Sequence, residues 1–393
     1  MKKAWVSIPD VLFFQEGPGV RNTQYTTEGV KLLNVANLVD GKIDLSTSDR
    51  YISEEEAYGK YKHFLCDAGD FIIASSGIKV EYIDKKMGFV DDTMLPLCMN
   101  TSTIRFKVLD EKQLRIRYFM YYLKSQNFKE QLFRQITGSA QLNYGPSHLK
   151  KMIIPLISLG KQDEIVACMD KVQNIIDMRQ QELVYLDDLI KARFVEMFGD
   201  PVSNSYGLPE ATLPELGEFG RGVSKHRPRN DPKLLGGDCP LIQTGDVANA
   251  GLYITSYNNT YSELGLKQSK MWDKGTLCIT IAANIAKTAI LEFDACFPDS
   301  VVGFTANEKT SNIFIHYWFS FFQAILESQA PESAQKNINL KILSELKIIV
   351  PEKDKQDEFV AFIKQVYKSK VAVQKALDET QLLFDSLMQQ YFG

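Results

Sequence analysis

KQDEIV occupies residues 161–166, and KQDEFV occupies residues 355–360. The match extends forward without a gap, because residues 161–199 align with residues 355–393 and both stretches end in Phe-Gly. The two copies lie 194 residues apart. A match of this length within one chain indicates a tandem duplication, and units of about 200 residues are too long for a solenoid repeat.

Shorter matches upstream support the duplication. SAQLN at residues 139–143 and SAQKN at residues 333–337 keep the same offset. MIIP at residues 152–155 and IIVP at residues 348–351 depart from it by two residues, which a short loop exchange explains.

Weaker similarity reaches further toward the start of each copy. LNVAN at residues 33–37 resembles IQTGD at 242–246, and DAG at 67–69 resembles DKG at 273–275, with offsets that drift to about 206–209. The chain therefore divides into a variable domain followed by a better-preserved helical segment, twice. The predicted boundaries are 1–155 for the first domain, 156–199 for the first helix, 200–351 for the second domain and 352–393 for the second helix.

The first helical segment carries an apolar heptad repeat and contains no Pro or Gly between residues 162 and 198. One seam position reads Met169, Ile176, Leu183, Ile190 and Met197, and the other reads Ile165, Val172, Arg179, Leu186 and Arg193. The second copy carries a similar seam. This spacing is typical of a coiled coil. A helix of this length would reach roughly 58 Å at 1.5 Å per residue.

Each apolar seam needs a partner, and the other copy is the most economical one. The first helix leads away from the first domain, so the second helix must return alongside it. We therefore predict an antiparallel coiled coil with one domain at each end, related by an approximate two-fold axis. Gly199 and Pro201 are expected to end the first helix. The alternative is two helices that each pack on their own domain.

Both variable domains are predicted to be α+β. Residues 64–78 and 271–285 alternate short apolar runs with Gly, Asn and Asp, which is typical of strand–turn–strand segments. Apolar helical patterns follow at residues 117–136 and 312–328.

Composition excludes several classes of protein. The chain is 45% apolar and 24% charged, as in ordinary globular domains. Its six cysteines are scattered without a CxxC motif, so we expect no metal site and no disulfide framework, and a cytoplasmic location. The apolar run at residues 313–326 is too short to span a bilayer. A net charge of −4 argues against nonspecific coating of nucleic acid.

Catalytic motifs are absent from the sequence. It contains no P-loop pattern, no HExxH and no GxSxG, and it lacks the acidic-Pro-Pro-aromatic tetrapeptide of amino-methyltransferases. We therefore predict no catalytic, cofactor-binding or metal-binding residues in this chain.

Polar, basic loops are the remaining candidates for function. GRGVSKHRPRN at residues 220–230 holds five basic residues and no acidic one, and EGPGVRNTQY at 16–25 is a shorter counterpart. Arg and Lys can neutralise phosphates, Arg can contact guanine, and Asn and Gln suit adenine. The predicted DNA-binding residues are Arg21, Asn22, Gln24, Tyr25, Ser75, Ser76, Lys79, Arg221, Lys225, His226, Arg227, Arg229, Lys267, Gln268, Lys270, Asn284 and Lys287. We interpret the two SAQ elements as structural joints between domain and helix, in preference to base contacts.

The order of these motifs resembles the specificity subunit of type I restriction-modification systems. The two copies SAQLN–MIIP–KQDEIV and SAQKN–IIVP–KQDEFV carry the resemblance, together with MFGDP at residues 197–201. GDVANAGLYI at 245–254 and FPDSVVGF at 297–304 also look like pieces of its target-recognition domains.

The resemblance implies two target-recognition domains that each read one half of a split, asymmetric sequence in double-stranded DNA. It also implies two methyltransferase subunits and ATP-dependent restriction subunits as partners in an antiviral defence complex. S-adenosylmethionine, ATP and Mg²⁺ are expected in those partners and not in this chain. The helices would hold the two readers about one turn of B-DNA apart, roughly 34–36 Å.

Two other classes of function remain open at this point. The chain could be a non-catalytic coiled-coil hub whose domains bind protein or glycan, or an enzyme without a recognisable motif. Basic loops at matching places in both domains favour the DNA reader over the hub, and the missing motifs argue against the enzyme.

Overall fold

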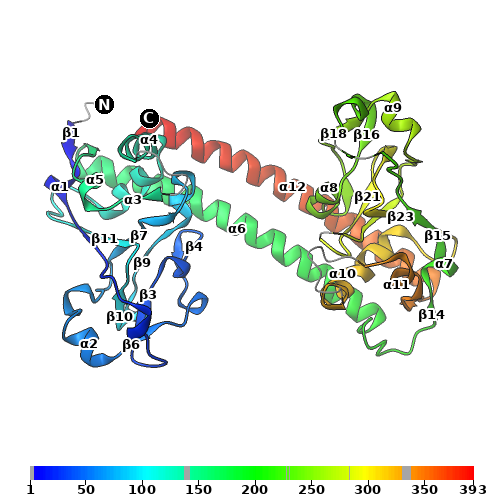
Figure 1. Cartoon of the computed structure of the whole chain (residues 1–393), viewed down its shortest axis with the longest axis horizontal. Coiled ribbons are helices and arrows are strands. Elements are labelled where there is room, and N and C mark those ends of the chain that lie inside the picture. Colours follow the sequence, from blue (N-terminus) through cyan, green and yellow to red (C-terminus); the bar gives the residue numbers. More distant parts are fainter. Residues whose placement is uncertain (1–3, 137–141, 227, 230, 283, 330–337) are drawn as a thin grey trace. The chain divides into compact units, whose positions relative to one another are not determined.

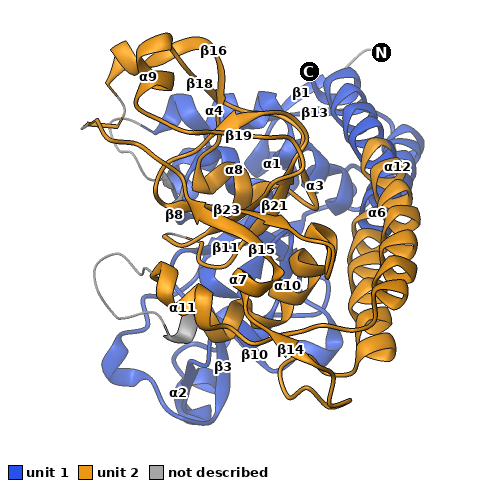
Figure 2. Ribbon diagram, turned by 90° about the vertical axis from the view of Figure 1, so that its right-hand side faces the viewer, with its two compact units in different colours: residues 1–179, 376–393 blue, residues 180–375 orange. Residues whose placement is uncertain are grey.

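The computed structural model describes residues 4–136, 142–226, 228–229, 231–282, 284–329 and 338–393. The chain forms two compact units (Figure 2). Unit 1 comprises residues 1–179 and 376–393, and unit 2 comprises residues 180–375. Each unit therefore combines one variable domain with parts of both long helices.

Unit 1 is built on a four-stranded antiparallel sheet in the order β2-β11-β7-β9, accompanied by a three-stranded sheet in the order β10-β3-β6 (Figure 1). All four residues of β7, Phe-Ile-Ile-Ala, are buried. Successive strand residues point to opposite faces, and Phe71 and Ile73 lie in the core with the helices while Ile72 and Ala74 lie in the core with the smaller sheet. The apolar run therefore reflects a strand covered on both faces.

The strands of these two sheets are β2 Leu12–Glu16, β3 Val30–Leu33, β6 Tyr51–Ile52, β7 Phe71–Ala74, β9 Met87–Phe89, β10 Leu97–Met99 and β11 Thr103–Val108. The paired short strands are β1 Ala4–Ser7 with β13 Ile153–Leu156, β4 Leu38–Val39 with β5 Lys42–Ile43, and β8 Ser76–Ile78 with β12 Leu142–Asn143. The short helices are α1 Ile8–Val11, α2 Glu54–Tyr58, α3 Ile116–Lys124, α4 Gln126–Gln135, α5 Pro146–Leu149, η1 Asn22–Gln24, η2 Val35–Asn37, η3 Leu45–Thr47, η4 Lys62–Phe64, η5 Val80–Lys85 and η6 Asp92–Met94.

Unit 2 is built on a five-stranded sheet in the order β15-β23-β20-β21-β17 and a four-stranded sheet in the order β18-β16-β22-β19. The strands are β15 Gly217–Arg221, β16 Leu235–Leu241, β17 Tyr253–Ile254, β18 Asn259–Tyr261, β19 Met271–Trp272, β20 Leu277–Thr280, β21 Thr288–Leu291, β22 Ala295–Cys296 and β23 Val301–Ala306, and β14 Glu210–Ala211 pairs with β24 Ile348–Ile349. The short helices are α7 Leu213–Leu216, α8 Thr244–Asn249, α9 Glu263–Lys267, α10 Asn312–Gln329, α11 Leu340–Glu345 and η7 Pro232–Leu234. Both variable domains are thus α+β, as the sequence predicts.

The weakly similar segments near the start of each copy have equivalent structures. Gly69 and Gly275 both adopt positive φ (87° and 91°), and their amides donate at 2.8 Å to the carbonyls of Val90 and Leu291, respectively. The amides of Asn34 and Gln243 each donate to a side chain three residues later, at 3.0 and 2.8 Å. Duplication therefore extends into the variable domains, where matching structure persists after most sequence identity has gone.

The two long helices, α6 Leu159–Phe198 and α12 Lys353–Phe392, have 40 residues each, and both contribute to both units. In unit 1 the first half of α6 shares a core with the end of α12, where Met169 and Ile176 lie with Phe384 and Met388. The predicted seam is buried in this part of the chain.

In unit 2 the second half of α6 packs against the first half of α12. The rings of Phe198 and Phe194 lie 5.6 and 5.4 Å from that of Phe359, and the Asp187 carboxylate pairs with the Lys370 ammonium at 2.5 Å. Because residue numbers fall along α12 as they rise along α6, the two helix segments are antiparallel within the unit, as predicted. The two-fold relation between the units stays a prediction.

The glutamine of each KQDE copy fastens its helix to a variable domain. The Gln162 amide donates to the carbonyls of Gln113 (2.8 Å) and Ile157 (2.9 Å), and its oxygen accepts from the Arg115 amide at 2.9 Å. In unit 2 the Gln356 amide likewise donates to two backbone carbonyls, those of Lys309 (3.0 Å) and Pro351 (2.9 Å). Its oxygen accepts from the Thr310 hydroxyl at 3.0 Å. Both glutamines are fully buried. A buried, saturated amide at the same place in each copy explains why this motif was retained twice.

The acidic residues of the motif act differently from what their charge suggests. A first-turn position would place them near the positive end of the helix dipole, but α6 begins at Leu159 and has no acidic residue in its first turn. Asp163 instead pairs with Arg115 at 2.8 Å. In the second copy Glu358 pairs with Arg193 at 2.9 Å. These carboxylates therefore support ion pairs along the helix surface.

Gly199 ends α6 as predicted. Its φ is +74°, and an added Cβ would lie 2.5 Å from the Ser205 hydroxyl, so a side chain is excluded here on both counts. None of the helices in the described part of the chain is long and apolar enough to cross a membrane.

Candidate nucleic-acid interface

The predicted basic residues of unit 2 gather at one end of its central sheet. Strand β15 ends at Arg221, which faces Val302, and β20 ends at Thr280, which faces Val301. The loops at 222–231 and 281–287 and the segment at 297–300 therefore leave the sheet at the same end.

The loops of unit 1 have the same arrangement. Strand β2 ends at Glu16, which faces Ile104, and β7 ends at Ala74, which faces Thr103. The segments at 17–25, 75–86 and 100–102 therefore correspond one by one to the three segments of unit 2.

Equivalent backbone hydrogen bonds hold these loops in both units. They join the amides of Gly17, Ser75, Gly222 and Ile281 to the carbonyls of Thr103 (2.9 Å), Ser102 (2.8 Å), Val301 (2.9 Å) and Ser300 (3.0 Å), respectively. An added Cβ would lie 2.0 Å from the Asn100 carbonyl oxygen at Gly17 and 2.2 Å from that of Phe297 at Gly222. Only glycine fits this close approach of two backbones, so each of these loops starts from a fixed point.

Side-chain contacts shape the basic loop of unit 2. The His226 amide donates to the Gln268 side chain at 2.9 Å, and the Ser269 hydroxyl donates to the Val223 carbonyl at 2.7 Å. Arg229 forms an ion pair with Asp299. The loop is therefore held to the segment that follows α9, which brings Lys267, Gln268 and Lys270 to the same region.

Asp231 fixes the end of this loop. Its carboxylate accepts from the Lys233 amide at 3.0 Å and lies 3.2 Å from the His226 ring. The Lys233 amide first, and His226 second, lower the pKa of Asp231 below its usual range. The negative charge of Asp231 is thus retained inside the loop, while Lys225 and Lys233 are exposed.

Most of the predicted cations have no carboxylate partner among the residues that the structure describes. This holds for Arg21, Lys79, Arg221, Lys225, Lys267 and Lys270. All six are exposed, and the Lys270 ammonium lies 3.7 Å from the centroid of the Trp272 ring. Exposed positive charges without internal partners are suited to phosphate groups.

In unit 1 the predicted polar residues divide into exposed and internally bonded side chains. Arg21 and Asn22 are exposed. The Gln24 amide donates to Glu56 at 2.6 Å and to Tyr61 at 3.1 Å, so its polar atoms hold the loop to α2 and η4. The second predicted segment begins with the fully buried Ser75, followed by the half-buried Ser76 and the exposed Lys79.

The corresponding segment of unit 2 contains Asn284 and Lys287. Asn284 is exposed with φ +41°, and its carbonyl accepts from the Thr280 hydroxyl. Lys287 is partly buried and lines a small cavity. Arg227 and the two SAQ triplets lie outside the described residues. The following strand β12 pairs with β8 beside Ser76.

Two residues that contact Tyr25, Arg50 and Asn100, were not predicted from the sequence. The Arg50 guanidinium lies 5.2 Å from the centroid of the Tyr25 ring, and the Asn100 amide donates to the Tyr25 hydroxyl at 3.4 Å. Both come from segments far from the basic loop in sequence, and Arg50 is exposed. Only the fold brings them to Tyr25.

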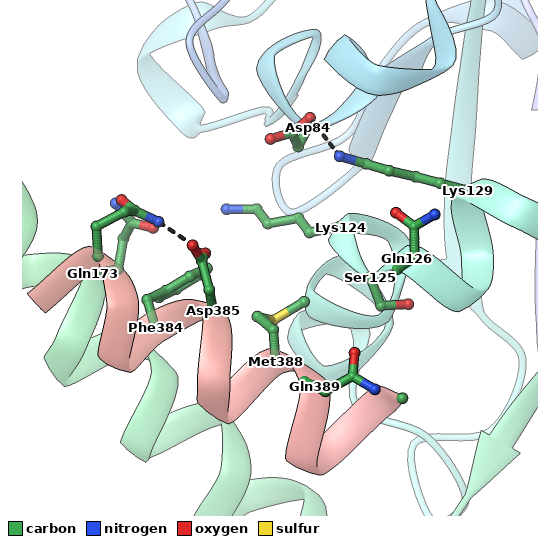
Figure 3. Close-up of a pocket in the computed structure, with 12 residues that line it drawn as sticks. Asp84, Lys124, Ser125, Gln126, Lys129, Gln173, Phe384, Asp385, Met388 and Gln389 are labelled. Carbon is green, nitrogen blue, oxygen red and sulfur yellow. Dashed lines mark hydrogen bonds and ion pairs between the residues drawn. The ribbon is translucent and has the colours of Figure 1, made fainter. Parts of the chain in front are cut away.

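One cavity lies in unit 1 and another in unit 2. Unit 1 has a polar cavity of about 450 Å³ between the α3–α4 junction and the end of α12 (Figure 3). Lys129 pairs with Asp84 across it at 3.1 Å, and burial lowers the pKa of the neighbouring Lys124. The described residues contain no cluster of three or more His, Cys, Asp or Glu side chains that could hold a metal ion.

A cavity of about 240 Å³ in unit 2 contains a partly buried histidine. His316 lies with its Nδ1 atom 2.9 Å from the Thr288 hydroxyl. Burial first, and the nearby Lys370 to a lesser extent, lower the pKa of His316 to about 4, while the hydrogen bond to Thr288 acts in the opposite direction. The imidazole is therefore neutral near pH 7.

Comparison with known proteins identifies the family. The family model for the type I restriction modification DNA specificity domain matches residues 25–186 and, a second time, residues 210–380. The chain belongs to this family. It is a specificity subunit of a type I restriction-modification system with two target-recognition domains, and DNA specificity is favoured over the protein-interaction hub.

Individual relatives agree with this assignment. The MjaX type I restriction enzyme specificity subunit of Methanocaldococcus jannaschii is 21% identical over 349 residues, covering 86% of this chain and 80% of the relative. The MjaVIII specificity subunit of the same organism is 25% identical over 181 residues, covering 45% of this chain and 41% of the relative.

Solved structures show the same fold at low sequence identity. The type I restriction-modification S subunit from M. genitalium superposes with a TM-score of 0.58 at 16% identity, covering 100% of this chain and 96% of the other. A chain from a structural study of the assembly and conformational transition of the type I system gives a TM-score of 0.57 at 16% identity, with 99% and 97% covered.

Proposed function

We propose that each unit of this specificity subunit reads one half of a bipartite, asymmetric DNA sequence through the three loops at one end of its central sheet. The observation that supports this proposal is that both units present topologically equivalent loops, held by equivalent backbone hydrogen bonds but with different side chains. Different side chains on matched supports read different bases, so the two half-sites should differ.

The proposal assigns separate roles to the polar side chains. Exposed cations without internal partners, such as Arg21 and Lys225, would contact phosphates and set the register. Asn22 and Asn284 are exposed amides that can contact base edges. Gln24 and Gln268, whose amides take part in bonds within the domain, would position loops instead.

The domain boundaries are proposed as they follow from the sequence, at residues 155, 199 and 351. The two 40-residue helices, which contribute to both units, would fix the distance between half-sites. This role explains why the helical copies are the best-preserved part of the repeat: a spacer must keep its length, whereas the readers are free to diverge.

We further propose that the chain is non-catalytic and works in the cytoplasm. Two methyltransferase subunits would supply S-adenosylmethionine chemistry and base flipping, and restriction subunits would supply ATP- and Mg²⁺-dependent activity. The purified chain alone should then show neither methyl transfer nor ATP hydrolysis.

Substitution at the two ends of one sheet tests the proposal. Methylome sequencing of cells that express the chain with its methyltransferase first identifies the target. Binding of the methyltransferase complex to DNA with one half-site scrambled at a time is then measured for the double variant Arg221→Ala/Lys225→Ala. Each lost phosphate contact should reduce the slope of log affinity against log salt by about 1, and recognition should weaken at one half-site only.

Lys274→Ala is the matched control for this experiment. Lys274 is an exposed lysine of the same domain, in the turn before β20 and so at the opposite end of the sheet. It should leave binding unchanged. Equal loss at both half-sites, or the same loss from Lys274→Ala, would contradict the assignment. Arg21→Ala/Lys79→Ala, with Lys112→Ala as its control, tests the other half-site in the same way.

A further inference from the structure

Two cysteines meet inside the smaller sheet of unit 2. The sulfur atoms of Cys239 on β16 and Cys296 on β22 lie 3.4 Å apart. The two strands are parallel, and Cys296 faces Leu241, two residues after Cys239. Residues two apart on a strand share one face, so both sulfurs point to the same side of the sheet.

The surroundings of the pair are apolar. Cys296 is buried with Leu234, Leu241 and Tyr261, and Cys239 packs against the edge of this cluster. A disulfide bond is about 2 Å long, so the sulfurs need to approach by roughly 1.4 Å. No pattern in the sequence indicates this pair, because 56 residues separate the two cysteines.

The two thiols differ in access. Cys239 is partly exposed and Cys296 is fully buried. Burial raises the pKa of the Cys296 thiol to about 12, with the Ser269 hydroxyl acting in the opposite direction and Cys239 in the same direction as burial. A small oxidant therefore reaches Cys239 first, and Cys296 waits behind it as the second thiol.

We propose that Cys239 and Cys296 form a redox-active dithiol that a hydroperoxide converts into a disulfide within unit 2. The Cys239 thiolate attacks a peroxide oxygen, the O–O bond breaks, and Cys239 becomes a sulfenic acid while water or an alcohol leaves. The Cys296 sulfur then attacks the Cys239 sulfur, the S–O bond breaks, and the hydroxyl leaves as water with the Cys296 proton. The two thiols lose two electrons to the peroxide, and a dithiol reductant reverses the change.

The site lies close to the basic loop but does not depend on the proposed function. Cys296 is followed directly by Phe297, which stacks on Trp272 with ring centroids 5.1 Å apart, and Asp299 three residues on holds Arg229. Cross-linking β16 to β22 would fix the base of this segment.

Peptide mapping of the full chain by mass spectrometry tests the proposal. After treatment with hydrogen peroxide and alkylation of free thiols, a cross-linked peptide containing Cys239 and Cys296 is expected, and dithiothreitol should remove it. When the chain is first unfolded in urea, peroxide should no longer link Cys239 to Cys296 in preference to other cysteines. These measurements need no variant, so a folding defect cannot obscure them.

Three variants separate the steps. Cys296→Ser should leave Cys239 as a sulfenic acid that dimedone traps, whereas Cys239→Ser should leave Cys296 reduced. Cys168→Ser is the matched control, because Cys168 is also partly exposed and its sulfur accepts a long hydrogen bond from the Tyr391 hydroxyl at 4.0 Å. This variant should form the disulfide as the unsubstituted chain does. Persistent free thiols at both positions, or a disulfide to another cysteine, would overturn the proposal.

Discussion

Replacing Gln162 by Ala should loosen the attachment of α6 to the first variable domain. The substitution removes three hydrogen bonds of 2.8–2.9 Å and leaves the Gln113 and Ile157 carbonyls and the Arg115 amide without their partner. A buried hydrogen bond contributes about 1 kcal/mol net. We therefore expect the free energy of unfolding of unit 1 to fall by about 3 kcal/mol.

Gln181→Ala on the same helix is the control. Gln181 is exposed, so this variant reproduces the gain in helix propensity on changing Gln to Ala, a few tenths of a kcal/mol, without the loss of buried bonds. Its free energy of unfolding should change by less than about 0.5 kcal/mol. Gln356→Ala should have a similar effect in unit 2, because two bonds to backbone carbonyls and one from the Thr310 hydroxyl are lost there.

Urea unfolding and hydrogen exchange provide the measurements. The denaturation curve gives the change in free energy, and exchange of the Arg115 amide reports directly on the bond to Gln162. Protection of this amide should fall selectively in Gln162→Ala. Unchanged protection, or equal destabilisation by Gln181→Ala, would show that the glutamine is not what fastens the helix.

Three further outcomes are expected. Gly199→Ala should destabilise the chain by about 2 kcal/mol or more, through positive φ and a clash, whereas Gly207→Ala, whose φ is +62° with no atom within 4 Å of the added Cβ, should cost only about 1 kcal/mol; thermal unfolding compares them. His316 is neutral in the folded state near pH 7, and its pKa in the unfolded chain is the usual value of about 6.5, so its contribution to the free energy of unfolding is complete above about pH 6.5 and falls by up to about 3 kcal/mol toward pH 4. His316→Gln should flatten this part of the stability–pH curve, and an unaltered curve would exclude His316 as the cause. Deleting residues 179–185 and 373–379 together shortens each helix by about 10 Å, so the methylome should show a spacer shortened by about three base pairs; an unchanged spacer would rule out the helices as the ruler.

The sequence predicts the repeat and the helices well because both rest on local, periodic patterns. An uninterrupted heptad without Pro or Gly can only be a long helix, and its apolar seam requires a partner. Met169, Ile176 and Ile190 of that seam are buried as expected. Leu183, in the middle, is only partly buried and belongs to neither unit core, because the helix segments bury most apolar surface where a variable domain adds a third partner.

The KQDE motif shows the limit of reasoning from residue type. Acidic residues suit the first turn of a helix, yet in this motif the uncharged glutamine makes the buried contacts. The helix begins two residues before Lys161, and a shift of this size decides which side chains face the domain. Helix starts are set by capping and tertiary contacts that a periodic pattern does not encode.

What the sequence by itself determined is the architecture: two related domains, two long helices and basic loops at matching places. Tertiary structure alone decided which of those loop side chains are exposed and which are bonded or buried inside the domain. Gln24 and Ser75 have side chains suited to bases but are used or buried inside the domain, while Arg50 reaches the surface of Tyr25 from a distant segment. The sulfurs of Cys239 and Cys296 likewise meet only across two strands. Periodicity is a property of neighbours along the chain, whereas hydrogen-bond partners and burial are properties of neighbours in space.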